Sequence, residues 1–136
     1  MQVRVLLPPQ FKLNTMNLKD RTNLLKDSCA RIPYGVKCQC FGRIGTIRSI
    51  DTFGNTEVEG FNGSFVIDVS HVKPYLFPLS SMTPKQKSEL SMLIADSEGM
   101  FDSVLIEIDF YHKHHIDYRD LIPMGLAIDA TNLNIY

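Results

Sequence analysis

The chain has 136 residues, of which 44% are hydrophobic, and its formal net charge is -1. This length and composition suit a single domain, 1–136, around one buried core, and two independent cores are not expected. No apolar run approaches the ~20 residues that a membrane-spanning helix requires, and the run in MQVRVLLPPQF is too short for a signal peptide, so we expect a cytoplasmic protein without a membrane partner.

The three cysteines and the charges add two further expectations. Cys29, Cys38 and Cys40 are odd in number and lie in one third of the chain, which favours reduced thiols over a disulfide framework. Residues 1–50 hold nine Lys or Arg and two acids, whereas 51–136 hold five and thirteen. We favour local neutralisation when the two parts fold together, and the alternative is a basic surface for phosphate or an acidic partner.

The first third predicts a strand and a helix. Residues 2–7, QVRVLL, alternate as in a short strand that ends at the following prolines. Residues 17–32 predict a helix with Asn17 at the N-cap and Pro33 after its end. Its apolar face, at helical spacing, consists of Leu18, Leu25, Cys29 and Ile32.

Residues 34–73 are short alternating segments separated by Gly and Asn turns. They predict a small curled antiparallel β-sheet of four or five strands, of SH3-like or OB-like barrel size, with a meander packed on helices as the alternative. Within it, Gly45 would permit a close approach of backbone or ligand, or a kink. Residues 74–82, with two prolines and several apolar anchors, predict an extended strap that crosses the core.

Residues 83–129 are predicted to be mainly helical. Thr83, Pro84 and Gln86 match an N-cap, a first helical position and the third residue of a capping box. The inner face of this helix consists of Leu90, Leu93 and Ile94. Residues 104–111 fit both a strand and a helix, and we choose the helix, with Asp102 able to cap it. The fold class is therefore α+β, with an N-terminal helix and C-terminal helices.

Three of the four histidines lie at His112, His114 and His115, shortly before Asp117. On a helix, His112 and His115 share a face and with Asp117 are candidates for a zinc site, although a catalytic zinc usually has three well-placed ligands. The favoured alternative is structural: His115 as an imidazolium at a helix terminus and Asp117 as a cap. No phosphate-binding loop or nucleophile elbow is present, so no catalytic residue and no cofactor are assigned.

Three segments resemble a known group of proteins: ARIPYGVKCQ, HVKPYLFPLSSMT and HHIDYRDLIPMGLAID. In this order they are similar to small uncharacterised proteins encoded by phages and mobile elements of Bacteroides-type gut bacteria, and the match covers most of residues 25–129. The resemblance implies a phage origin and no established reaction. FDSVLIEIDFYHKHH departs from the group because it is richer in β-branched residues than the usual helix there.

The expected function is that of a non-enzymatic binding or adaptor protein in the host bacterial cytoplasm. Its partner would be nucleic acid, or a host or phage protein that docks on the aromatic strap. For nucleic acid, Tyr34 or Phe41 would supply stacking. The cations expected to face the partner are Lys19, Lys26, Arg31, Lys37, Arg43 and Arg48. The alternative is a metal-dependent enzyme that uses His112, His115 and Asp117.

Overall fold

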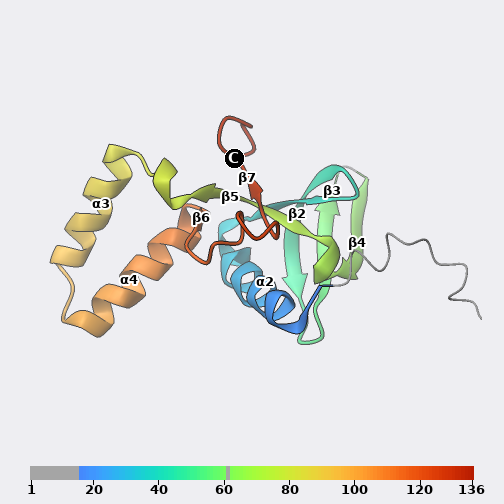
Figure 1. The fold of residues 1–136 in the computed structure, drawn as a ribbon, viewed down its shortest axis with the longest axis horizontal. Helices are drawn as coiled ribbons and strands as arrows, with labels where there is room; N and C mark the ends of the chain where they lie inside the picture. The colour runs from blue at the N-terminus through green and yellow to red at the C-terminus, as the bar shows by residue number, and fades with distance from the viewer. Residues whose placement is uncertain (1–15, 61) are drawn as a thin grey trace, which may run out of the picture.

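The computed structural model describes residues 16–60 and 62–136, so the strand predicted at 2–7 lies outside the described residues. Helix α2 (Leu18–Arg31) comes first and leads into a meander of β1 (Lys37–Cys40), β2 (Arg43–Ile50), β3 (Asn55–Gly60) and β4 (Gly63–Asp68). Strand β5 (Lys73–Pro78), helices α3 (Pro84–Ala95) and α4 (Met100–Lys113), and the short strands β6 (Ile116–Asp117) and β7 (Ile128–Asp129) complete the order (Figure 1).

The sheet is open. Its strand order is β4-β3-β2-β1-β5-β6, and β7 also pairs with β5. The meander and the β1–β5 pair are antiparallel, whereas β6 and β7 run parallel to β5. Because β5 continues past β1 to pair with β6 and β7, the sheet does not close into the predicted barrel. The α+β class, with an N-terminal helix and C-terminal helices, is confirmed.

The segment predicted as a strap at 74–82 begins as a strand of the sheet. Its aromatic Tyr75 is 5% exposed and Leu76 is completely buried, so neither offers a docking surface. The prolines predicted an extended strap, and the segment also makes sheet hydrogen bonds: the Phe77 amide donates to the His115 carbonyl at 2.8 Å, and the Leu76 carbonyl accepts from the Ala130 amide at 2.7 Å. These bonds give β5 its parallel neighbours.

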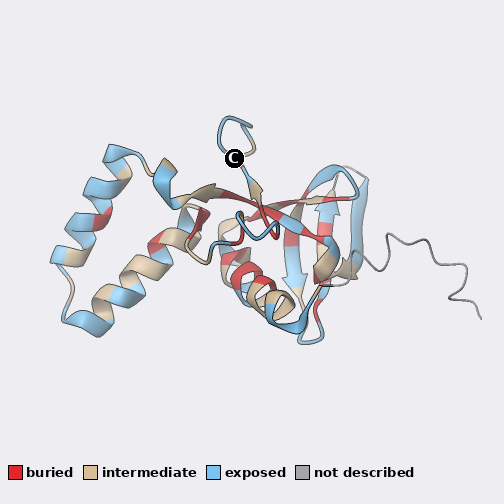
Figure 2. Cartoon of the chain, in the orientation of Figure 1, coloured by how far each residue is buried: buried red, intermediate tan, exposed pale blue. Residues whose placement is uncertain are grey.

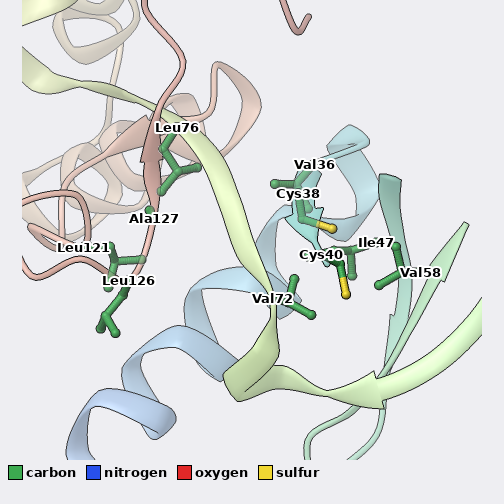
Figure 3. Close-up of a cluster of buried hydrophobic side chains, with 10 residues drawn as sticks. All are labelled: Val36, Cys38, Cys40, Ile47, Val58, Val72, Leu76, Leu121, Leu126 and Ala127. Carbon is green, nitrogen blue, oxygen red and sulfur yellow. The ribbon is translucent and has the colours of Figure 1, made fainter. Parts of the chain in front are cut away.

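The main core lies between the meander, β5 and the turn that precedes β7. In Figure 3 strand β5 runs between the side chains of the meander and those of residues 121–127. The buried residues of the main core are Val36, Cys38, Cys40, Ile47, Val58, Val72, Leu76, Leu121, Leu126 and Ala127. Two of the three cysteines are therefore core residues, and all three are free thiols.

Helix α2 turns a partly polar face inward. Asn17 caps it as predicted, because the Asn17 side chain accepts from the Asp20 amide. The predicted apolar face is wrong in part, because Leu18 is 77% exposed and Cys29 is exposed as well. The residues that the helix buries are Leu24, Asp27, Ser28 and Arg31. Asp27 and Arg31 are tolerated because they form a paired, completely buried interaction, with Nε of Arg31 2.8 Å from Oδ2 of Asp27.

The C-terminal helices form a hairpin that stands away from the sheet (Figure 1). The capping box of α3 is confirmed in both directions, between Thr83 and Gln86. The helix chosen for residues 104–111 is confirmed as part of α4. A second small core at the base of the hairpin consists of Leu90, Phe110 and Ile116. The predicted helical part ends at Lys113, and the remaining chain forms β6, turns and β7.

Gly45 is the position in the sheet that a side chain would disturb most clearly. A Cβ built there lies 2.5 Å from Val58 Cγ1 and 3.0 Å from the Glu59 carbonyl oxygen. We expect Gly45→Ala to lower the free energy of unfolding by about 1–3 kcal/mol through overpacking, measured by urea denaturation. Gly60→Ala is the control, because its Cβ meets only the Gly63 oxygen at 3.9 Å. Equal losses in the two variants would contradict this account.

The buried ion pair yields a second prediction. Arg31→Met leaves the Asp27 carboxylate buried without its main partner, and we expect a loss of about 3–5 kcal/mol in the free energy of unfolding. The nearby Arg119, with Nε 3.5 Å from Asp27 Oδ1, offsets part of this loss. The double variant Asp27→Leu/Arg31→Met removes both charges and should be more stable than the single variant in the same denaturation experiment. A double variant that is less stable would refute the charge argument.

Candidate binding site at the edge of the sheet

The candidate site lies at the hairpin turn between β1 and β2. The β1–β2 turn consists of Phe41 and Gly42, between the paired residues Cys40 and Arg43. Both central residues have positive φ, 52° and 75°, as a type I′ turn requires. Phenylalanine is an uncommon residue in this conformation, which carries strain and often marks a functional site. The turn leaves the Phe41 side chain 75% exposed.

A pocket with a volume of about 360 Å³ opens beside this turn. Its floor includes Cys40 and Val58, which belong to the main core, and its walls include Phe41 and Phe65, whose ring centroids are 6.4 Å apart. The described lining residues are Cys40, Phe41, Arg43, Ile44, Gly45, Val58, Gly60, Asn62, Gly63, Ser64 and Phe65. Arg43 is the single charged residue among them. The pocket is an apolar opening into the core with one cation at its rim.

Strand β4 borders the pocket and forms an edge of the sheet. Among residues 16–60 and 62–136, no strand pairs with its outer side. Natural edge strands are commonly protected by Lys, Pro or a bulge. The β4 sequence GSFVID contains neither Lys nor Pro, and it exposes 41% of Phe65 and 67% of Val66. Among the described residues, the amide and carbonyl groups on the outer side of β4 therefore have no partner strand, and β4 itself lines the pocket.

The predicted cations differ in their exposure. Lys19, Lys26 and Arg43 are exposed, and Lys37 is half-buried. Arg31 is completely buried and unavailable to a partner, so the prediction that it faces outward is wrong. Exposed Arg48 contacts Glu59, with Nε 2.8 Å from Oε1.

The structure brings together Phe41 and Arg43, but not the other aromatic candidate. Tyr34 donates its hydroxyl proton to the Asp109 carboxylate at 2.6 Å. This hydrogen bond raises the pKa of Tyr34. Phe65 was missed by the sequence analysis, because its position beside Phe41 depends on the register of β4 against β3, with Val58 opposite Phe65. The alternation in SFVID indicated a strand but not which strand would be the edge.

The histidine cluster is engaged in contacts within the protein. His112 Nε2 lies 2.7 Å from the Tyr118 hydroxyl, and the His115 ring stacks on Tyr136 with centroids 4.0 Å apart. The Asp117 carboxylate accepts from the Leu121 and Ile122 amides. The short helix that Asp117 was predicted to cap is not formed, because residues 118–122 contain no helix. In the described part of the chain, no group of three His, Cys, Asp or Glu side chains is placed to hold a metal ion.

The charge state of His115 differs from the prediction. Burial, together with the positive charge of Arg31 and the neighbouring His114, lowers the pKa of His115 to about 4. The ring is therefore neutral at pH 7, and the expected imidazolium at the helix terminus is wrong. The negative end of the helix dipole would favour the charged ring. Burial disfavours the charged ring more strongly, because His115 is only 7% exposed.

Comparisons with known proteins add no family to this description. No family model matches the chain, and neither the curated proteins nor the solved structures gave a match. Within the described residues, no helix combines the length and the apolar character needed to cross a bilayer.

The depressed pKa of His115 predicts a pH dependence of stability. Between the unfolded value of 6.5 and the folded value of about 4, the unfolded chain binds more protons than the folded one. The contribution of the neutral His115 ring to the free energy of unfolding is therefore fully present above pH 6.5. It is lost as the pH drops through this window, by at most about 3 kcal/mol.

His115→Asn tests this assignment, because asparagine tolerates the left-handed φ of 57° at this position. We expect the free energy of unfolding of the variant, measured by urea denaturation from pH 7 to pH 4, to depend less on pH. Asp68, whose folded pKa is about 2, loses its contribution mainly below this window. Equal slopes for variant and parent would contradict the role of His115.

Proposed function

We propose that the protein is a non-enzymatic adaptor that binds an extended peptide segment of a partner protein at β4. The peptide adds as a further strand to the sheet and places one apolar side chain between Phe41 and Phe65. The observation that carries this proposal is the edge of β4 beside the pocket, which no other strand of the described residues covers. Strand addition is a common mode of peptide recognition, in which main-chain hydrogen bonds give affinity and a pocket gives specificity.

The charge at the pocket indicates which peptide sequences would bind. Arg43 is the single charged residue among the described residues that line the pocket. A carboxylate beside the inserted apolar side chain would pair with this guanidinium, which suits bidentate recognition. The preferred ligand is therefore an extended segment with a large apolar residue next to Asp, Glu or a terminal carboxylate.

A peptide fits this site better than nucleic acid. Proteins that bind single strands generally use a positively charged groove that follows the phosphates, together with aromatic stacking. Here Arg31 is buried, Arg48 contacts Glu59, and Arg43 is isolated at the pocket. The pocket has aromatic rings that could stack on bases, but its described lining residues include one cation instead of the row of cations that would follow the phosphates.

The resemblance to proteins of Bacteroides-type phages and mobile elements supports a proposal about where this adaptor acts. We place it in the host bacterial cytoplasm, where its partner would be a host or phage protein. The meander and β5 would then be an opened variant of a small SH3-like or OB-like sheet, in which antiparallel strands curl around one core. The opening at β4 would be the feature that serves binding.

Selection from a random peptide library on the full chain tests the proposal. We expect enriched peptides with a large apolar residue beside an acidic one, and affinities measured by calorimetry that fall at least about 10-fold for Phe41→Ala and for Arg43→Glu. Phe53→Ala is the matched control, because Phe53 is 76% exposed, nearly as much as Phe41, but lies in the β2–β3 turn. It should bind the peptides like the parent.

Two results would refute the proposal. The first is the absence of any enriched motif, or peptide binding that Phe41→Ala and Phe53→Ala affect equally. The second is binding of labelled oligothymidine or oligoadenylate that weakens steeply with salt and is lost in Arg43→Glu, because this behaviour would assign the site to nucleic acid.

A further inference from the structure

The hairpin of α3 and α4 exposes large apolar side chains beyond its small core. Leu90 and Phe110 are buried at the base, but most of the hairpin is exposed or only half-buried in Figure 2. On α4, Met100 and Phe101 are 84% and 79% exposed. Single exposed apolar residues are common, whereas a group of neighbours on one element marks an interaction site.

The exposed residues of α4 follow helical spacing. Val104 and Leu105 follow Phe101 by three and four residues, so the three side chains lie on one side of the helix. Val104 is 46% exposed and Leu105 is 51% exposed. On α3, Met92 and Leu93 are also exposed, at 68% and 42%. An apolar stripe of this kind on α4 is suited to pack against a further helix.

The charges of the hairpin restrict what can cover it. The lysines of the hairpin, Lys85, Lys87 and Lys113, lie at the start of α3 and at the end of α4, and from residue 88 to 112 the chain has no Lys or Arg. The same stretch contains six acids, which are Glu89, Asp96, Glu98, Asp102, Glu107 and Asp109. Two of these carboxylates accept hydrogen bonds from tyrosines, Asp109 from Tyr34 and Glu107 from Tyr111. No ion pair among the described residues involves any of the six.

This combination selects one kind of occupant. A second copy of the hairpin, a nucleic acid or an anionic membrane would bring like charge to these acids, which opposes association. We propose that the α3–α4 hairpin binds an amphipathic helix of a partner protein, with an apolar stripe that covers Phe101, Val104 and Leu105 and flanking Lys or Arg that face the acids. This surface is separate from the site at β4, because the two lie at opposite ends of the molecule in Figure 1.

Synthetic peptides of about 18 residues, long enough for a helix of several turns, test the proposal on the full chain. One peptide has leucines at helical spacing flanked by lysines, the second has the same composition in scrambled order, and the third replaces the lysines with glutamates. By fluorescence anisotropy we expect the first to bind at least about 10-fold more tightly than either of the others. Salt should weaken its binding.

Variants then locate the binding. Phe101→Ala/Leu105→Ala should weaken the basic amphipathic peptide at least about 10-fold, whereas Phe53→Ala should not change it. Asp96→Lys/Glu98→Lys changes only the charge at exposed positions and should also weaken binding, so the test does not depend on one variant folding. Phe41→Ala should leave this binding intact, and the failure of one site is therefore distinguishable from the failure of the other.

Three outcomes would overturn the proposal. Equal binding of the ordered and scrambled peptides would show attraction by charge alone. Binding unaffected by both hairpin variants would place the peptide elsewhere. A dimer in sedimentation equilibrium that Phe101→Ala/Leu105→Ala abolishes would assign the surface to a second copy of the chain.

Discussion

The arrangement of the elements depends on the buried guanidinium of Arg31. Its Nε and Nη2 atoms donate to both oxygens of Asp27, at 2.8 and 3.1 Å, within the same helix. Nη2 also donates to the Ile116 carbonyl at 2.6 Å, and Nη1 to the Tyr111 carbonyl at 3.2 Å. Tyr111 lies in the last turn of α4, where carbonyls lack helical partners, so one side chain of α2 caps α4 and holds β6. A buried charge tolerates no alternative arrangement that leaves it unpaired, which makes this contact specific as well as stabilising.

Both proposed binding surfaces follow from this anchor. Arg31 holds the start of β6, and the carbonyl of His115 just before it accepts from Phe77 of β5. Strand β5 therefore continues along β6 instead of curling back toward β4, and β4 remains an edge among the described strands. The same anchor holds the base of the α3–α4 hairpin against α2. The distal part of the hairpin has no such neighbour in the part of the chain that the structure describes, and its apolar residues are exposed there.

The sequence predicted features whose causes are local and missed those whose partners are distant. Asn17 and the Thr83–Gln86 capping box involve residues three apart, so their residue types were sufficient. Arg31 looked like a surface cation, because nothing nearby shows that its guanidinium meets a carbonyl at Ile116, 85 positions later. In the same way Phe41 and Arg43 were predicted from their own turn, whereas Phe65 depends on the pairing of β4 with β3 and on the absence of a strand beyond it in the described residues. The α+β class followed from periodicity, but barrel closure is a property of long-range pairing.

Within the part of the chain that the structure describes, charges of the basic and acidic parts are neutralised by ion pairs at one end of the molecule but not at the other. Arg21 and Arg48 of the basic part pair with Asp68 and Glu59 of the acidic part, as local neutralisation predicts. The six acids of the hairpin take part in none of the ion pairs of the described residues and remain a local concentration of negative charge. With a net charge of only -1, the chain has little overall repulsion to keep exposed apolar surfaces of different copies apart. The acids around Phe101 would supply that repulsion, and at the same site they would attract the cationic helix proposed as partner. On this proposal the same charges oppose self-association and favour one kind of partner, which would explain why an apolar surface persists there in solvent.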